Sequence, residues 1–101
     1  MIELIRDESG CSGVLSGAMT IYEVAELKRS LDEFWSQDEP LSLDLAAVND
    51  IDTAGVQWLL ALRQTIGERL TLSMHSVPVI EIFDLYQLAP FFGDVIVLTD
   101  H

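Results

Sequence analysis

The sequence has few of the residues that build disulfides, metal sites and anion-binding surfaces. Its 101 residues include one cysteine and two histidines, and 5 lysines and arginines stand against 17 aspartates and glutamates. Because Cys11 has no second cysteine to pair with, no disulfide can form within the chain. The net charge of −12 argues against nucleic acid as a partner, since phosphates need a basic protein surface. It argues equally against attraction to anionic membrane surfaces.

A long hydrophobic run is also missing. The longest apolar stretch is far shorter than the roughly 18 residues that a membrane span needs. The first residues lack the basic-then-apolar pattern of a signal peptide. We therefore expect a cytoplasmic protein without membrane insertion. Half of the residues are hydrophobic, which suffices for the core of one globular domain spanning residues 1–101.

Motifs for catalysis, cofactors and metals are absent from the sequence. Neither His75 nor His101 has a cysteine or histidine neighbour at the spacing of metal ligands. The glycines match no phosphate-binding loop, and no serine or cysteine nucleophile has a histidine nearby in the sequence. Asp50 and Asp52 could be imagined as an acid/base pair, but residues two apart in a tight turn need not face each other. We predict no catalytic residue, no metal and no cofactor, and hence no enzyme.

The rest of the sequence alternates short apolar strands with segments of helical periodicity. Strands are predicted at residues 1–6, 11–15, 41–45, 70–74 and 95–98, and helices at residues 21–35, at 54–66 and from Pro78 to Tyr86 or Gln87. The polar turn 7–10 favours an antiparallel hairpin of the first two strands, and Gly17 is expected to end the second strand. The order β-β-α-β-α-β-α-β implies βαβ crossovers. The expected fold is α/β, with a mixed, mostly parallel sheet of about five strands packed against helices.

Each predicted helix has a signal for its ends and its buried face. Thr20 and Glu23 form a capping box, in which the threonine hydroxyl would accept from the Glu23 amide while the glutamate reaches back. Gly67 is a natural αL C-cap for the second helix. The buried face of the first helix is expected to contain Val24, Leu27, Leu31 and Phe34. That of the second is expected to contain Val56, Leu59, Leu60, Ile66 and, at its margin, Arg63. Residues 88–94 are expected to be a connector.

The junction from Val48 to Val56 is the strongest candidate for function. A strand feeds a helix there through an acidic turn, which places the Thr53 hydroxyl at the helix N-terminus. On chemistry alone, Thr53 or Asp52 could simply cap the helix. Alternatively, Thr53 could accept a phosphate, which would lie at the positive end of the helix dipole near the amides of Gly55 and Val56. The added charge beside Asp50 and Asp52 would then repel a docked partner.

This junction also carries a family resemblance. The segment Leu43-Asp44-Leu45, followed by Ile51-Asp52-Thr53-Ala54-Gly55-Val56, resembles the signature of STAS domains, and the predicted order of strands and helices is similar to theirs. In anti-sigma-factor antagonists of this family, a serine or threonine after the aspartate is phosphorylated by a kinase that is also the anti-sigma factor. The unphosphorylated form binds that partner, and phosphorylation breaks the complex. The resemblance implies that Thr53 is the phosphoacceptor and that the protein regulates transcription by binding a protein partner.

The Asp-Thr-Ala-Gly form of the motif also resembles two other branches of the family. One is the STAS subunit bound to the ATPase of a bacterial phospholipid-transport complex, and the other is the group of short STAS proteins associated with chemosensory kinases. All three branches imply a protein-binding surface at this turn. The residues expected to bind the partner are Asp50, Asp52, Thr53, Ala54, Gly55, Gln57 and Trp58. For Trp58, two interpretations stay open: an exposed interface anchor, or packing against a neighbouring helix.

Overall fold

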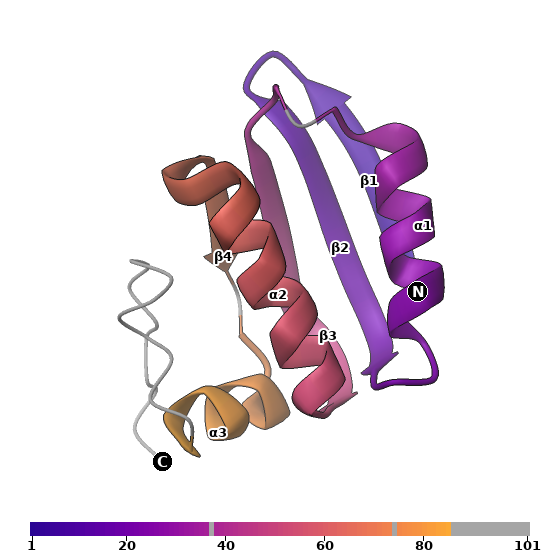
Figure 1. The fold of residues 1–101 in the computed structure, drawn as a ribbon, viewed down its shortest axis with the longest axis vertical. Helices are drawn as coiled ribbons and strands as arrows, with labels where there is room; N and C mark the ends of the chain where they lie inside the picture. The colour runs from indigo at the N-terminus through magenta and orange to yellow at the C-terminus, as the bar shows by residue number, and fades with distance from the viewer. Residues whose placement is uncertain (37, 74, 86–101) are drawn as a thin grey trace.

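A computed structural model describes residues 1–36, 38–73 and 75–85 of the chain. Figure 1 shows its strands and helices in chain order. The strands are β1 (Ile2–Asp7), β2 (Gly10–Met19), β3 (Leu41–Ile51) and β4 (Leu70–Ser73). The helices are α1 (Val24–Phe34), α2 (Thr53–Ile66) and α3 (Val77–Leu85), with a short 3-10 turn at Gly67–Arg69. The predicted alternation of strands and helices is confirmed over this part of the chain.

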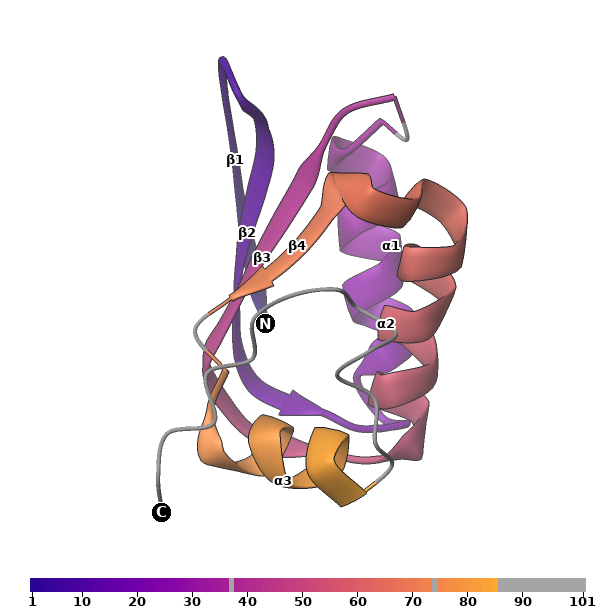
Figure 2. The same ribbon diagram turned by 90° about the vertical axis from the view of Figure 1, so that its left-hand side faces the viewer.

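The strands form one mixed sheet in the order β1-β2-β3-β4. β1 and β2 pair antiparallel, as the hairpin prediction required, whereas β2 with β3 and β3 with β4 pair parallel. Helices α1 and α2 lie side by side on one face of the sheet, and α3 packs against β3 (Figure 2). The sheet has four strands within the described residues; the predicted connector 88–94 and strand 95–98 lie outside them.

Two strands are longer than predicted. β2 continues through Gly17 to Met19, because Gly17 takes a φ of 80° at a shift in the register with β3. A glycine at such a bulge bends a strand without ending it, so the expectation that Gly17 stops β2 is wrong. β3 continues from Leu45 to Ile51. The long ends of β2 and β3 curve together beneath α1 and α2 (Figure 2).

The core is a continuous apolar cluster between the sheet and the helices. Leu15, Leu43, Leu45 and Leu59 have no exposed surface, and no charged or polar side chain within the described residues is buried. Gly67 is the C-cap of α2 as predicted, but its φ of 59° and ψ of −130° lie outside the αL region that was expected. Burial of this kind contributes about 25 cal/mol for each Å² of apolar surface removed from water, so the core is the main source of stability.

The buried faces of α1 and α2 differ from the predicted ones at their ends. α1 begins at Val24 rather than Ile21, and its last residue, Phe34, is 37% exposed. The buried side chain at this end is that of the C-cap residue Trp35. Trp35 already has extended backbone, which turns its ring inward, and its Nε1 donates to the Glu39 carbonyl at 3.1 Å. On α2 the buried face includes Leu62, while Leu60 is only partly buried. Both differences from the predicted buried faces arise from tertiary packing, which the spacing of apolar residues alone does not reveal.

Candidate functional site

The candidate site is the turn between β3 and α2. β3 ends at Ile51, and Asp52 adopts extended backbone (φ −123°) before the helix begins at Thr53. Oδ1 of Asp52 accepts hydrogen bonds from the amides of Ala54 at 2.9 Å and Gly55 at 3.2 Å. The capping residue of α2 is therefore Asp52, one of the two caps considered above. A cap of this kind satisfies amides that have no carbonyl partner in the first helical turn.

The second carboxylate oxygen of Asp52 joins the turn to a distant segment. Oδ2 accepts from the amide of Ile21 at 3.0 Å, across 31 residues of sequence. This bond from Ile21 is the main reason that the pKa of Asp52 lies below its ordinary value; the Gly55 and Ala54 amides lower it further, against an opposing effect of desolvation. Asp52 thus remains ionised and holds the β2–α1 turn beside the start of α2.

Gly55 explains how closely these two segments approach. A Cβ atom on Gly55 would lie 2.3 Å from the carbonyl oxygen of Met19 and 2.9 Å from Cγ1 of Ile51. Only a residue without a side chain lets the first turn of α2 rest on the end of β2. Gly55 is buried, so it positions the site and does not present a surface to a partner.

The predicted site residues divide into an exposed group and an inner group. Asp50, Thr53 and Gln57 are exposed, and Ala54 and Asp52 are partly buried. Trp58 is only 6% exposed, so the interpretation of Trp58 as an exposed anchor is wrong and the helix-packing interpretation holds. With Trp35 it lines a groove of about 320 Å³ between α1 and α2, together with Lys28, Asp32, Ala61, Leu62 and Thr65.

The amides expected to receive a phosphate are already engaged. The Gly55 amide donates to the Asp52 side chain, and the Val56 amide donates to the Asp52 carbonyl at 3.1 Å. The expectation that these two amides are open for a phosphate on Thr53 is therefore wrong. Within the described residues, no group of three or more His, Cys, Asp or Glu side chains is placed to hold a metal ion.

Two exposed apolar residues beside the turn were missed from the sequence. Ile21 is 68% exposed and Tyr22 is 89% exposed, and both follow directly on Thr20. The capping box does form in part: Glu23 accepts from the Thr20 amide at 3.0 Å and from its hydroxyl. The Thr20 hydroxyl, however, accepts a hydrogen bond from the backbone amide of Tyr22 at 3.3 Å and not from the amide of Glu23. The sequence signal for this exposed pair was the position of two apolar residues inside a capping box, ahead of the apolar stripe that the helix buries.

A comparison with protein families identifies this arrangement. Residues 7–97 match the family model described as Mlab, STAS domain. The chain belongs to the STAS domain family. Because the match spans most of the chain, it includes the β3–α2 turn as well as the sheet and helices of this STAS domain. No curated protein matches the chain.

Solved structures support the STAS fold. An anti-sigma factor antagonist from Mycobacterium paratuberculosis superposes with a TM-score of 0.82 at 17% identity, over 97% of this chain and 86% of that one. The anti-sigma factor antagonist SpoIIAA, in its unphosphorylated form, superposes with a TM-score of 0.72 at 14% identity, over 96% of this chain and 90% of that one. At these identities, the likeness shows that the fold is shared. No helix among the described residues of this STAS domain is long and apolar enough to cross a membrane.

Proposed function

We propose that this STAS domain is a non-enzymatic regulatory module that binds a protein partner through the exposed side of the β3–α2 turn. The observation that carries the proposal is the exposure of Thr53 at the first position of α2, on a turn held rigid by Asp52. Asp50 and Gln57 are exposed on either side of Thr53 in the sequence. A rigid turn with an exposed threonine is a suitable contact surface because little conformational entropy is lost on binding.

The same geometry supports Thr53 as the residue through which binding is switched. A phosphate on Thr53 would add about 1.5 to 2 negative charges next to the ionised Asp52. Because the carboxylate of Asp52 already holds the Ala54 and Gly55 amides, those amides would not draw the phosphate into the fold. The phosphate would act on the surface instead, where it would repel a partner fitted to the unmodified turn. The partner in this case is a kinase, either an anti-sigma factor or a chemosensory kinase.

A second candidate follows from the family description. The matching model is described as Mlab, STAS domain, and the Asp-Thr-Ala-Gly form of the motif resembles the STAS subunit of a phospholipid-transport complex. In that candidate, the same turn contacts a transporter ATPase permanently, and Thr53 remains unmodified. Both candidates need the surface around Thr53 to be free for a protein, but only the first needs a phosphate.

The test is to recover the tagged chain from its own cells and quantify the proteins bound to it, with Thr65 as the matched control. Thr53 and Thr65 are both exposed on α2, at its first turn and near its end. Thr53→Glu should reduce the recovery of the partner by about tenfold or more, which corresponds to about 1.4 kcal/mol of binding free energy. Thr65→Glu adds the same charge and should leave recovery unchanged.

Mass measurement of the recovered chain separates the two candidates. A phosphate that is present on the wild-type chain and absent from Thr53→Ala supports the switch, and the identity of the partner names the kinase. Recovery of an ATPase with unphosphorylated Thr53 supports the constitutive subunit. If Thr53→Glu and Thr65→Glu retain the partner equally, the β3–α2 turn is not the contact and both candidates fail.

A further inference from the structure

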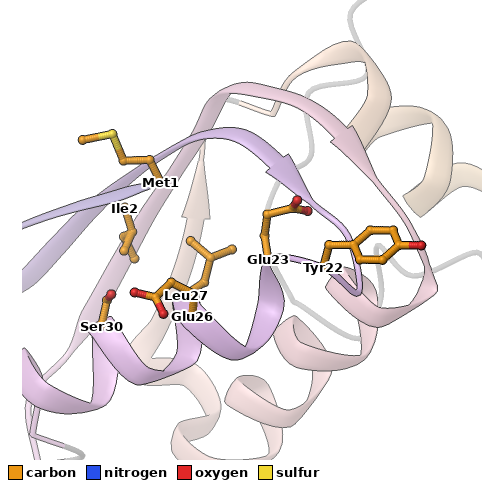
Figure 3. Close-up of a pocket in the computed structure, with 7 residues that line it drawn as sticks. All are labelled: Met1, Ile2, Tyr22, Glu23, Glu26, Leu27 and Ser30. Atoms are coloured by element: carbon orange, nitrogen blue, oxygen red, sulfur yellow. The ribbon is translucent and has the colours of Figure 1, made fainter.

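A groove lies between the start of β1 and the first half of α1. Its volume is about 440 Å³, and seven residues line it: Met1, Ile2, Tyr22, Glu23, Glu26, Leu27 and Ser30. Figure 3 shows these side chains coming from the start of the chain and β1, from the β2–α1 turn and from α1, with Ile2 on β1 facing Leu27 on α1. Leu27 is buried and Ile2 is partly buried, so the floor of the groove is apolar.

Two of the side chains that line the groove are large, apolar and exposed. Tyr22 is the most exposed large hydrophobic residue of the described chain, and Met1 is also largely exposed. An exposed tyrosine beside an apolar floor is a typical anchor in protein interfaces, because its ring covers a large area with few rotatable bonds. Exposed apolar surface of this kind costs solubility in a free protein and is stabilised when a partner covers it.

The charged side chains that line the groove are both acidic. Glu26 is largely exposed and shares Arg29 with Glu33, and the carboxylate of Glu23 is turned toward Thr20. No lysine or arginine side chain lines the groove, in a chain whose net charge is −12, and the terminal ammonium of Met1 is already bonded to the Ser16 carbonyl at 2.8 Å. An occupant with basic side chains is therefore attracted, and an acidic segment is repelled.

The groove is also held in place before any partner arrives. The Met1 carbonyl accepts from the Ser16 amide at 2.8 Å, which ties one wall to β2. Tyr22 follows Ile21, whose amide donates to Asp52, and Glu23 is bonded to Thr20. The bond from Ile21 to Asp52 places the Tyr22 end of the groove next to the β3–α2 turn. A partner seated on Thr53 would therefore lie close to the Tyr22 end of the groove.

We propose that the groove between β1 and α1 receives a segment of the protein partner that carries apolar side chains flanked by lysine or arginine. This inference rests on the proposed function, which states that the partner is a protein. It adds the chemistry by which that partner is recognised. The apolar side chains cover Ile2 and Leu27, with Tyr22 at one end of the groove, and the basic side chains lie over Glu23 and Glu26. The surface around Thr53 and the groove then form two adjoining parts of one interface.

The experiment is a titration of the ¹⁵N-labelled full chain with short peptides, followed by amide chemical shifts. The probes are acetyl-Lys-Arg-Leu-Leu-Lys-Arg-amide, a version with glycine in place of leucine, and an acidic version with Glu-Asp in place of Lys-Arg. The basic apolar peptide should give saturable shifts in the amides of Tyr22, Glu23, Glu26 and Leu27. The glycine version should bind at least about tenfold more weakly, and the acidic version should not bind.

Two variants connect the shifts to the groove. Tyr22→Ser and Glu26→Gln should each weaken the binding of the basic apolar peptide by about threefold or more. Both substitutions change exposed side chains on which the fold does not depend. Glu33→Gln is the matched control, because Glu33 and Glu26 both pair with Arg29 and are similarly exposed, while only Glu26 lines the groove. It should leave the affinity unchanged.

Several results would overturn the proposal. Equal affinity for the leucine and glycine peptides would show that net charge alone attracts them. An equal loss of affinity in Glu26→Gln and Glu33→Gln would also show that the groove itself is not recognised. Shifts that avoid residues 22–27 would place the peptide elsewhere. Because the titration uses neither the partner nor a change at Thr53, its outcome is independent of the Thr53→Glu test. Failure of the groove therefore differs visibly from failure of the proposed function.

Discussion

At the scale of single residues, Asp52 organises the candidate site. Its two carboxylate oxygens accept from three backbone amides, two at the start of α2 and one in the β2–α1 turn. Asp50, two residues earlier, is exposed. The two aspartates therefore have different roles, although the sequence shows them as a similar pair. Asp52 maintains the shape of the turn, and Asp50 contributes charge to its surface.

A pair of substitutions tests this division. Asp52→Ala should lower the free energy of unfolding by about 1 to 2 kcal/mol, because it removes a helix cap and a tie between segments. Asp50→Ala removes the same charge and should change the free energy of unfolding by less than about 0.5 kcal/mol. Urea unfolding followed by circular dichroism measures both. Equal losses in the two variants would mean that net charge, and not capping, determines the contribution of Asp52.

At the scale of elements, α2 presents different chemistry on its two sides. The side chains of Trp58 and Leu59 are buried on the inner side of α2, whereas Thr53 and Gln57 are exposed. Gly55 sets the distance between the helix and the end of β2, where any side chain would meet the Met19 carbonyl. The helix is therefore fixed by its inner residues, and its first outer residues are left for a partner.

Adjacent positions of α2 make this contrast measurable. Trp58→Ala should reduce the free energy of unfolding by about 3 to 5 kcal/mol, since it opens a cavity between α1 and α2. Gln57→Ala should change it by less than about 0.5 kcal/mol, since its side chain lies in water. Urea unfolding again gives both values. A small effect of Trp58→Ala on stability, with loss of the partner, would restore Trp58 as an interface anchor.

At the scale of the whole molecule, an excess of acidic groups makes each basic contact important. Arg6 on β1 donates through Nε to Glu39 Oε2 at 2.8 Å and through Nη2 to Oε1 at 2.6 Å. The same guanidinium lies 4.6 Å from the centre of the Phe34 ring. This contact joins the edge of the sheet to the loop between α1 and β3. It lowers the pKa of Glu39 to about 2, with a further contribution from the Ser36 amide.

The lowered pKa predicts how stability responds to acid. Because the folded pKa of Glu39 lies below its ordinary value of 4.5, its contribution is complete above pH 4.5 and is lost as the pH falls toward about 2. In unfolding experiments across this range, Glu39→Gln should flatten the fall in stability. Arg6→Gln should flatten it as well, because it removes the main cause of the shift. An unchanged acid response in Arg6→Gln would show that the ion pair is not its source.

Most of the fold was predictable from local patterns in the sequence. Alternating apolar residues in 41–45 and helical spacing in 54–66 gave correct elements, and Gly67 gave a correct helix end. The positions of Asp52 and Thr53 at the strand-to-helix junction also followed from sequence. These features depend on neighbours within a few residues, so their causes are visible in the chain itself. The strong excess of acidic residues was likewise a property of sequence alone.

The tertiary structure decided which surfaces the same residues present. The burial of Trp58 and Trp35 depends on how α1 and α2 lie against each other, and the exposure of Tyr22 depends on the turn ahead of α1. The bond from Ile21 to Asp52 joins residues far apart in the chain. Contacts of this kind have no periodic signature, because they arise only when separate elements pack together. The sequence determined where the turn lies, and packing determined that its inner groups hold the fold while Thr53 faces outward.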